Sequence, residues 1–357
     1  MVKILHVISD KNIGGAGKLL LNTICEHDRS KFGLSVALPN GSLLTPHVKN
    51  AGIRAKESNL SLLELIKIIH TEKPDIVHTH ACTKARIAAR LCLVPITVNT
   101  KHCATDTKEK LGFCKRLAVF LFDFLFTSHT IATAEYVKER LVLDGIPQKK
   151  ITVIINGSLP LKTYTDEEKA LLRVKYGFDV NDFLVGIVAR VERGKGQEYF
   201  AEAAEICKKI APRIKFIVVG EGAMLENLKS SASNLNNLFF TGFLSDVSEI
   251  MNILDANVNC SYISETSSLS LSEGMSVGAI PVVSNCGGNA FMAKKCGIVV
   301  PSKNGRALAD ALIKLAESPH TAKELKKAAI LRFFDEFTAK AMVRKTEKLY
   351  LSLLGKL

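Results

Sequence analysis

The stretch from 256 to 284 reads Ala256-Asn-Val-Asn-Cys260, Ser261-Tyr-Ile-Ser-Glu265-Thr-Ser-Ser-Leu-Ser-Leu-Ser-Glu273-Gly-Met-Ser-Val-Gly-Ala and Ile280-Pro-Val-Val-Ser284. The first and last pieces are short and apolar, which predicts two strands. The middle piece is a Ser/Thr-rich turn followed by a helical pattern over 269–277. A strand, a helix and a second strand in this order form a parallel β-α-β unit, so the stretch predicts an α/β fold.

The same alternation continues from this stretch in both directions. Further strands are predicted at 3–9, 34–38, 75–80, 96–102, 130–134 and 151–156 in the first half, and at 183–189, 214–220, 238–242, 256–260, 280–284 and 297–300 in the second. Helical patterns separate these runs. Each half is therefore predicted to be a doubly wound unit with a parallel sheet, whose ligands bind beyond the carboxyl ends of the strands.

A polar segment separates the two series. Asn156-Gly-Ser-Leu-Pro160 is followed by the charged stretch 163–169, and together they predict a hinge. We predict one domain over 1–158 and a second over 159–334. Residues 325–357 form one long helical pattern with an apolar stripe, and we expect its end, from about 335, to pack back on the first domain.

Composition excludes several classes of protein. The 357 residues are 47% hydrophobic and 23% charged, as in folded globular proteins and unlike disordered ones. The longest apolar stretch, 117–126, is half the length of about twenty residues that a membrane-spanning helix needs. The amino terminus is predicted to be a strand and not a signal peptide. Nine cysteines without a C-x-x-C pair favour a reduced, cytoplasmic setting.

The formal net charge is +13, and the excess of Lys and Arg is larger in residues 1–158 than in the remainder. Such an excess predicts a negative partner, which is nucleic acid, an anionic membrane face or a phosphorylated substrate. Nucleic-acid binding is disfavoured, because the cations are dispersed, Trp is absent and no zinc-ligand spacing occurs.

Basic residues precede the apolar stretch 117–126. They are Lys101, Lys108, Lys110, Lys115 and Arg116. One interpretation is a helix that lies peripherally on the anionic inner face of a membrane and reaches a lipid-linked acceptor. The other is a core helix with a solvated, charged start, and the sequence leaves both open.

Glycine-containing turns after predicted strands suit phosphate groups. Gly14 and Gly15 precede a helix start with free N–H groups, and the alternative is a turn that serves only close packing. Arg190 and Lys195 lie in the loop after strand 183–189, and Gly220 ends the next strand at the same edge. Their charges and the loop N–H groups suit a diphosphate, with a solvated basic loop as the alternative.

Two glutamates flank a helix start in the opening stretch. Glu265 precedes the helix and Glu273 lies eight positions later. The N–H groups of Thr266, Ser267 and Ser268 lie between them, where a helix start binds an anion. Carboxylates accept hydrogen bonds from hydroxyls, so this order matches a nucleotide sugar, in which a diphosphate joins a ribose to a hexose.

These motifs resemble the retaining glycosyltransferases of family 4. The resemblance rests on the Glu265/Glu273 pair, Gly274-Met-Ser-Val-Gly278, Asn285-Cys-Gly-Gly288 and Pro74-Asp-Ile-Val-His-Thr-His80. It implies the GT-B fold, two Rossmann-like parallel-sheet domains facing a central cleft. Thr266-Ser-Ser268 departs from the Gly and Pro found in many relatives, which bears on sugar selectivity, and the Glu that often follows the Gly-Gly pair is absent.

The resemblance implies a retaining hexosyltransferase. It would move a sugar from a nucleotide diphosphate sugar, bound by the second domain, to a glycan or lipid-linked acceptor in cell-surface polysaccharide or glycolipid assembly. In the family, Arg190 and Lys195 correspond to the clamp on the diphosphate, Glu273 to the ribose contact and Glu265 to the sugar contact. The N–H groups of Thr266, Ser267, Ser268 and Leu269 at the helix start would also stabilise the charge of the diphosphate. The sequence contains no D-x-D, so we expect no metal and no cofactor.

Three histidines lie at predicted strand ends. His102 matches the family's strand-end histidine near the transfer site, and a buried, hydrogen-bonded histidine is the alternative. His78 and His80 share one face of a strand and suggest a metal site. No third ligand is visible in the sequence, so strand-end packing is favoured.

Other functions stay open on the same scaffold. A nucleotide-sugar epimerase would convert the donor without an acceptor, and a glycan phosphorylase is a further alternative. A non-catalytic sugar-binding protein is the third, but Arg190, Lys195, Glu265 and Glu273 are all present, which argues against it.

Overall fold

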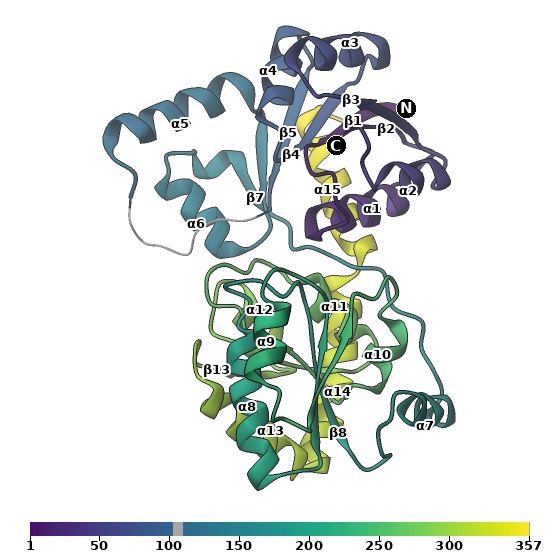
Figure 1. Cartoon of the computed structure of the whole chain (residues 1–357). Helices are drawn as coiled ribbons and strands as arrows, with labels where there is room; N and C mark the ends of the chain where they lie inside the picture. The colour runs from purple at the N-terminus through teal and green to yellow at the C-terminus, as the bar shows by residue number, and fades with distance from the viewer. Residues whose placement is uncertain (103–109, 357) are drawn as a thin grey trace. The chain divides into compact units, whose positions relative to one another are not determined.

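The structure is a computed structural model that describes residues 1–102 and 110–356, so the predictions on Cys103 and Lys108 lie outside the described residues. The chain forms two compact units (Figure 1). Unit 1 comprises Met1–Ser158 and Ala339–Leu357, and unit 2 comprises Leu159–Thr338. Each is an α/β unit with a parallel sheet, as the sequence predicts.

Unit 1 is built on a seven-stranded sheet with the order β3-β2-β1-β4-β5-β6-β7. The strands are β1 Val2–Ile8, β2 Phe32–Pro39, β3 Arg54–Ser58, β4 Ile76–His80, β5 Ile96–Lys101, β6 His129–Ala132 and β7 Ile151–Val153. The strand order reverses between β1 and β4. The carboxyl ends of these two strands therefore mark the point where ligands bind in such sheets.

Helices cover both faces of this sheet. They are α1 Gly15–Glu26, α2 Thr45–Asn50, α3 Leu62–Glu72, α4 Thr83–Leu91, α5 Phe113–Phe126, α6 Glu135–Leu143 and α15 Ala339–Leu353. On one face, Leu5 and Val77 of the sheet pack against Leu65 of α3 and Ala85 of α4. The carboxyl-terminal helix α15 packs against α1, so the end of the chain belongs to unit 1.

Unit 2 has a six-stranded sheet with the order β10-β9-β8-β11-β12-β13. The strands are β8 Phe183–Val188, β9 Ile214–Val219, β10 Leu238–Gly242, β11 Ala256–Asn259, β12 Ile280–Ser284 and β13 Ile298–Val300. The helices are α7 Asp166–Lys175, α8 Gln197–Ile210, α9 Leu225–Ser231, α10 Ser248–Ile253, α11 Leu269–Ser276, α12 Asn289–Ala293, α13 Gly305–Ala316 and α14 Pro319–Arg332.

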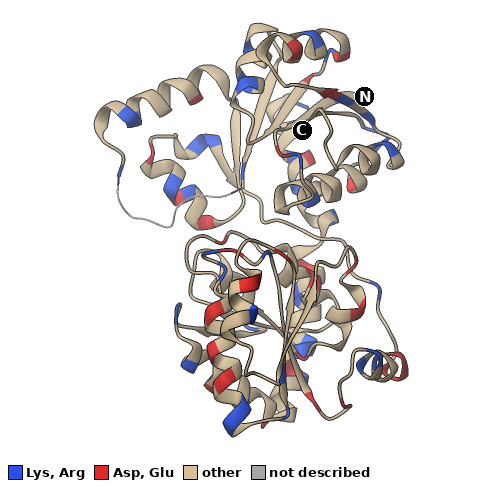
Figure 2. Ribbon diagram, viewed as in Figure 1, with Lys and Arg blue, Asp and Glu red and all other residues tan. Residues whose placement is uncertain are grey.

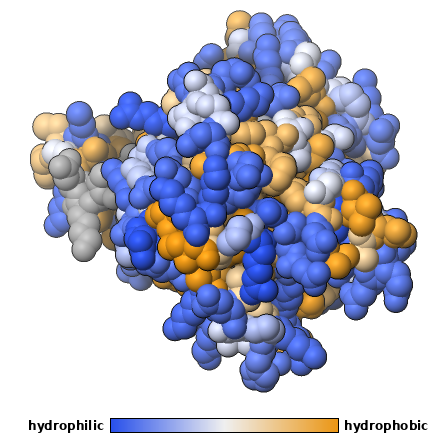
Figure 3. All heavy atoms as spheres, turned by 60° about the horizontal axis from the view of Figure 1, so that its bottom comes forward, coloured by the Kyte–Doolittle hydropathy of each residue, from blue (hydrophilic) through white to orange (hydrophobic). Residues whose placement is uncertain are grey.

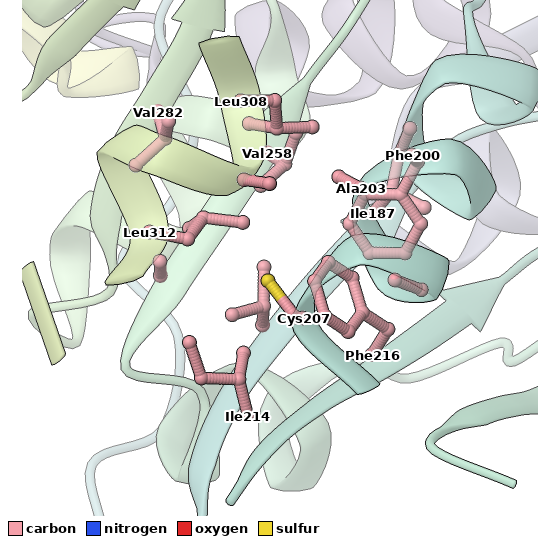
Figure 4. Close-up of a cluster of buried hydrophobic side chains, with 14 of the residues drawn as sticks. Ile187, Phe200, Ala203, Cys207, Ile214, Phe216, Val258, Val282, Leu308 and Leu312 are labelled. Atoms are coloured by element: carbon pink, nitrogen blue, oxygen red, sulfur yellow. The ribbon is translucent and has the colours of Figure 1, made fainter. Parts of the chain in front are cut away.

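The main core of unit 2 lies between the sheet, α8 and α13. Strand residues Ile187, Phe216 and Val258 pack with Phe200 of α8 and Leu312 of α13 (Figure 4). A second cluster joins the opposite face of the sheet to α7 and α10. Both faces are thus covered by helices, which explains why the strands are continuous apolar runs without alternation.

β3 and the start of α7 differ from the sequence prediction. β3 is not predicted, because Arg54–Ser58 is mostly polar; it is an edge strand that pairs only with β2 and needs no apolar run. The predicted hinge at 163–169 is partly wrong, because α7 begins within it at Asp166. Thr165 and Glu168 form a capping box there, which fixes the helix start.

The prediction of one long helix over 325–357 is wrong. The helix α14 ends at Arg332, a π-helical turn covers Phe333–Phe337, and α15 begins at Ala339. Phe333 and Phe337 are fully buried, so the turn places both rings in unit 2 before the chain enters unit 1. Among the described helices, none has the length and apolar character of a membrane span.

Candidate active site

Glycines let three loops meet at the carboxyl edge of the unit 2 sheet. Gly196, in the loop after β8, has φ +80°, and a Cβ there would lie 2.1 Å from the Cys260 carbonyl oxygen after β11. Gly220, directly after β9, has φ +138°, and a Cβ there would lie 2.1 Å from the Ala189 carbonyl oxygen. A residue with a side chain does not fit at either position. The loops after β8, β9 and β11 are therefore packed together.

Lys195 and Glu265 meet at this edge. Lys195 Nζ lies 2.9 Å from Glu265 Oε2, although the two residues are 70 positions apart. Ser261 Oγ and Asn259 Nδ2 also donate to this oxygen, at 2.9 and 3.2 Å. The side chains of Lys195 and Glu265 are 28% and 13% exposed, so the pair is held in place by the protein and remains open to solvent.

Arg190 lies apart from this pair. Its side chain is 71% exposed, and Nη1 pairs with Glu192 Oε1 at 2.9 Å. Its backbone is fixed, because Gln197 Nε2 donates to the Arg190 carbonyl oxygen at 2.9 Å. The backbone of Arg190 is thus anchored to α8, while its guanidinium group is exposed and paired with Glu192.

The predicted anion-binding turn leads into α11. Ser268 caps the helix by accepting a hydrogen bond from the Leu271 N–H at 3.3 Å, and α11 then begins at Leu269. Thr266 and Ser267 are buried in the turn. Glu273 is only 5% exposed and lies inside the helix, while Glu265 precedes it. The two glutamates therefore stand on either side of the helix start.

The glycines of the first turn in unit 1 serve different purposes. A Cβ on Gly17 would lie 2.7 Å from the Asn12 carbonyl oxygen, so close packing requires that glycine. A Cβ on Gly15 would meet nothing within 4 Å, and one on Gly14 would meet only Asp10 Oδ2, at 3.6 Å. Packing alone therefore does not require glycine at the two predicted site positions.

Four histidines gather in the sheet of unit 1, His6 and His78 within β1 and β4, His80 at the end of β4 and His102 directly after β5. His80 Nδ1 lies 3.1 Å from His102 Nε2, and His80 Nε2 lies 3.3 Å from His6 Nδ1. His78 bonds through Nδ1 to the Tyr350 hydroxyl at 2.5 Å and through Nε2 to Thr100 Oγ1 at 2.6 Å. His102, which is only partly buried, thus belongs to a hydrogen-bonded row that the sequence did not reveal.

The expectation that His78 and His80 lack a third possible metal ligand is wrong. His6 of β1 brings a ring nitrogen to within 4.8 Å of theirs. Both nitrogens of His78 are nevertheless engaged by other side chains, and its ring stacks on that of His80 with centroids 4.4 Å apart. Metal ligation needs the ring nitrogens to point at one ion, so this geometry favours packing.

Burial keeps these histidines neutral. It is the main cause that lowers the pKa of His78 from its usual 6.5 to about 3 and that of His102 to about 4. Burial, followed by the neighbouring histidines, also lowers the pKa values of His6 and His80 well below the usual value. Each of these rings therefore carries one hydrogen at neutral pH.

Sequence reasoning missed the residues that support the candidate groups. Asn259 and Ser261 hold Glu265, Gln197 holds the loop of Arg190, and His6 and Tyr350 join the histidine row. Polar Asn259 and Ser261 at the end of a buried strand were a usable signal. His6 and Tyr350 gave none, because their partners lie far away in the sequence.

Two known protein families match this chain. The family described as Glycosyl transferases group 1 matches residues 168–332. The family described as Glycosyltransferase Family 4 matches residues 13–158. The two matches together include the candidate groups of both units.

Individual proteins are similar over most of the chain. An Escherichia coli protein named UDP-Gal:alpha-D-GlcNAc-diphosphoundecaprenol alpha-1,3-galactosyltransferase is 29% identical over 317 residues, 82% of each chain. The putative glycosyltransferase EpsD of Bacillus subtilis is 26% identical over 298 residues, 78% of each chain.

Solved structures share the fold. The crystal structure of Anabaena Alr3699/HepE in complex with UDP has a TM-score of 0.86 at 18% identity and covers 98% of this chain and 100% of its own. The same protein in complex with UDP-glucose has a TM-score of 0.85 at 18% identity and covers 99% and 100%.

Proposed function

The chain belongs to the GT-B glycosyltransferases of group 1, and from this we propose that it moves a hexose from a nucleotide diphosphate sugar to a glycan or lipid-linked acceptor. Unit 2 binds the donor and unit 1 binds the acceptor. The anomeric configuration of the sugar is retained. The proposal assigns the reaction to cell-surface polysaccharide or glycolipid assembly on the cytoplasmic side of a membrane.

The observation that carries this proposal is the pair of Lys195 and Glu265 at the carboxyl edge of the unit 2 sheet. On donor binding, Lys195 turns to the diphosphate, and Glu265 then accepts hydrogen bonds from hydroxyls of the hexose. Ser261 and Asn259 keep the carboxylate in position throughout. Without donor, Lys195 and Glu265 thus neutralise each other's charge. When the donor binds, its diphosphate becomes the partner of Lys195 and its hexose hydroxyls become the partners of Glu265.

The remaining donor contacts follow from the loops of this edge. Arg190 joins Lys195 on the diphosphate, supported by the N–H groups of Thr266, Ser267, Ser268 and Leu269 at the start of α11. Glu273 binds the ribose hydroxyls. Gly220, Gly14 and Gly15 are assigned to donor binding as well, because a glycine backbone can approach a phosphate closely.

The transfer needs no protein nucleophile in this proposal. The bond from the sugar C1 to the phosphate oxygen breaks, a bond from C1 to the acceptor oxygen forms, and a donor phosphate oxygen takes the acceptor proton. Arg190, Lys195 and the α11 start stabilise the departing diphosphate, which is the charge that develops in the transition state. These groups supply the positive charge, so the proposal includes no metal and no cofactor.

Relatives suggest a donor and an acceptor. The Escherichia coli relative is named for UDP-Gal and an undecaprenol diphosphate, and the Anabaena neighbour binds UDP and UDP-glucose. We extend these to this chain as a uridine diphosphate hexose and a lipid diphosphate saccharide. Such an acceptor resides in a membrane, so the enzyme needs a surface that meets lipid.

The helix α5 has the composition of such a surface. Its large apolar side chains are exposed: Phe113, Leu117, Phe120, Leu121, Phe124 and Leu125. Its buried residue is instead polar, Asp123, which pairs with Lys150 at 2.7 Å. A helix of a globular protein normally buries its apolar side chains, whereas α5 packs Val119 against the core of unit 1 and leaves many of its large apolar side chains exposed.

Figure 2 shows α5 without charge along most of its length, with a basic segment at its start. Figure 3 shows hydrophobic residues gathered at the left edge, where α5 lies. Basic residues such as Lys110, Lys115 and Arg116 accompany the apolar face. This combination is typical of a helix that lies in the interface of an anionic bilayer, and we propose that α5 docks there.

Vesicle sedimentation tests the docking of α5. The protein should sediment with phosphatidylglycerol vesicles and not with phosphatidylcholine vesicles. The double variant Phe124→Ser/Leu125→Ser should lose this binding, while Leu63→Ser, at a residue 71% exposed on α3, should keep it. Equal binding by the double variant and the control would contradict the proposal, as would self-association of the chain through α5 without vesicle binding.

A transfer assay tests the function itself. Radiolabelled UDP-galactose or UDP-glucose is incubated with and without a lipid diphosphate N-acetylglucosamine acceptor. The proposal predicts label in the lipid fraction only with the acceptor, and a glycosidic bond with the anomeric configuration of the donor. Conversion of the donor alone would indicate an epimerase instead. Phosphorolysis of a glycan would indicate a phosphorylase.

A further inference from the structure

A hollow of about 340 Å³ lies in unit 2, away from the candidate active site. It is surrounded by one face of α7, the carboxyl ends of α10 and α11, and α14 (Figure 1). Leu254 and Val277 line it, and they precede β11 and β12. These amino ends of parallel strands lie at the edge of the sheet opposite to the one where Lys195 and Glu265 meet. The hollow is therefore separate from the proposed donor site, and we call it the α7 hollow.

The floor of the α7 hollow is apolar. Ile253, Leu254 and Val277 line it and are at most 8% exposed. They belong to the buried cluster that joins the sheet to α7 and α10. The volume of the hollow falls in the range of about 300–1,000 Å³ that pockets for small molecules have. A floor of this kind suits the hydrocarbon part of a small organic molecule.

Three cations line the same hollow, Lys169 and Arg173 of α7 and Lys326 of α14. Arg173 is held by the protein, because its side chain is 14% exposed and donates to Asp255 Oδ2 at 2.9 Å and to backbone carbonyl oxygens. Lys326 shares this carboxylate, with Nζ 2.6 Å from Asp255 Oδ1. Asp255 therefore serves two cations with a single negative charge.

The charges of the α7 hollow do not balance. Within residues 1–102 and 110–356, Lys169 has no acidic partner. The acidic residue of the lining is Asp166, in the first turn of α7, where the helix start stabilises its charge. With Asp255, two carboxylates thus face three cations. The hollow combines an excess of positive charge with an apolar floor.

We propose that the α7 hollow binds a small organic anion with an apolar body. The charged group of this anion, a phosphate ester or a carboxylate, lies between Lys169 and Lys326, and its apolar body covers the floor. Lys326 is 38% exposed and turns from Asp255 to the ligand, while Arg173 continues to neutralise the carboxylate. This second site does not rest on the proposed function.

Titration calorimetry of the full chain with phenyl phosphate tests the proposal. Saturating UDP is present, because the candidate active site of unit 2 also suits a phosphate. We expect a Kd of about 5 mM or below, and binding at least about tenfold weaker for phenol, which has the same ring without the charge. Benzoate replaces phenyl phosphate in a parallel titration. Binding of either anion supports the site and identifies its charged group. Binding of neither anion, or equal affinity for phenol, would overturn the proposal.

Variants locate the bound anion. Lys169→Met removes the charge and keeps the length of the side chain, so it should weaken phenyl phosphate binding about tenfold and leave phenol binding unchanged. Ala170→Phe places a ring in the hollow and should abolish the binding of both. Lys327→Ala is the matched control, because Lys327 neighbours Lys326 on α14 but pairs with Glu324 and does not line the hollow. This control should bind phenyl phosphate as the wild type does.

Thermal unfolding checks that each variant is folded. Lys169→Met stays informative if Ala170→Phe does not fold, since it alters one partly exposed side chain. Equal affinities of Lys169→Met and Lys327→Ala for phenyl phosphate would show that the anion binds elsewhere and would contradict the proposal. No sugar is transferred in these titrations, so their result is independent of the acceptor assay.

Discussion

The ion pair of unit 2 and the histidine row of unit 1 lie at corresponding places, the carboxyl ends of parallel strands, but they differ in charge and burial. Lys195 and Glu265 are oppositely charged and partly exposed. His6, His78 and His80 are neutral and at most 2% exposed. A solvent-accessible pair can exchange each partner for a ligand group, whereas a buried row can only orient its neighbours. The proposed function thus gives unit 2 a site that exchanges partners, whereas the side chains of the histidine row are already paired with one another.

Removal of the Lys195 side chain should have the largest effect on the rate of sugar transfer. Lys195→Ala is expected to lower kcat/KM at least about 100-fold, as loss of one preorganised charge-stabilising group does in other enzymes. Lys229→Ala is a matched control, because Lys229 pairs with Glu226 at 2.9 Å on α9. Steady-state transfer kinetics should show no change in that control. Similar losses in both variants would remove Lys195 from the site.

The second prediction separates glycines required for packing from glycines kept for a ligand. Gly196→Ala should lower the free energy of unfolding by about 2–3 kcal/mol, because its φ is +80° and its Cβ would contact Cys260. Gly15→Ala, where the Cβ meets nothing within 4 Å, should change it by less than about 0.5 kcal/mol. Denaturant unfolding measures both. If Gly15→Ala proved the more damaging, the glycines of the first turn would be structural.

Acid should destabilise unit 1 before unit 2. Eight of the nine histidines belong to unit 1, where folding lowers the pKa of His78 to about 3 and of His102 to about 4. Below about pH 6.5 these histidines are protonated in the unfolded chain but stay neutral in the folded chain. The free energy of unfolding therefore falls as the pH drops toward about 4. At pH 5 each such histidine lowers the free energy of unfolding by about 2 kcal/mol.

Hydrogen exchange at pH 7 and pH 5, resolved by peptide, measures this difference. Protection should decrease mainly in β1, β4 and β5. His78→Gln should reduce the pH dependence, and His47→Gln, at an exposed site, should leave it unchanged. An equal loss of protection in unit 2 would show that the buried histidines are not the cause.

Much of the fold could be predicted because parallel strands are marked by local signals. The bounds of β10 and β12 agree with the prediction, since apolar runs and flanking turns define them. β3 and the break after α14 could not be predicted. An edge strand needs no apolar run, and a helix break that serves two separate cores leaves a continuous apolar pattern in the sequence.

The candidate site was predictable by residue type and less so by contact. Glu265 and Lys195 stood out by their positions after strands, but their ion pair joins segments 70 positions apart. The contact between His6 and His80 spans 74 positions and depends on strand order and register. Sequence patterns report local structure, so such pairings become visible only when the sheet is assembled.

Titration calorimetry with UDP and with a UDP-hexose tests the central claim most directly. Lys195→Ala should weaken the binding of both ligands at least about tenfold, because the proposal places Lys195 on the diphosphate they share. Glu265→Gln should weaken only the UDP-hexose, because the proposal places Glu265 on the sugar. Equal weakening of both ligands by Glu265→Gln, or wild-type protein that binds neither, would contradict the proposed exchange of the ion pair for the donor.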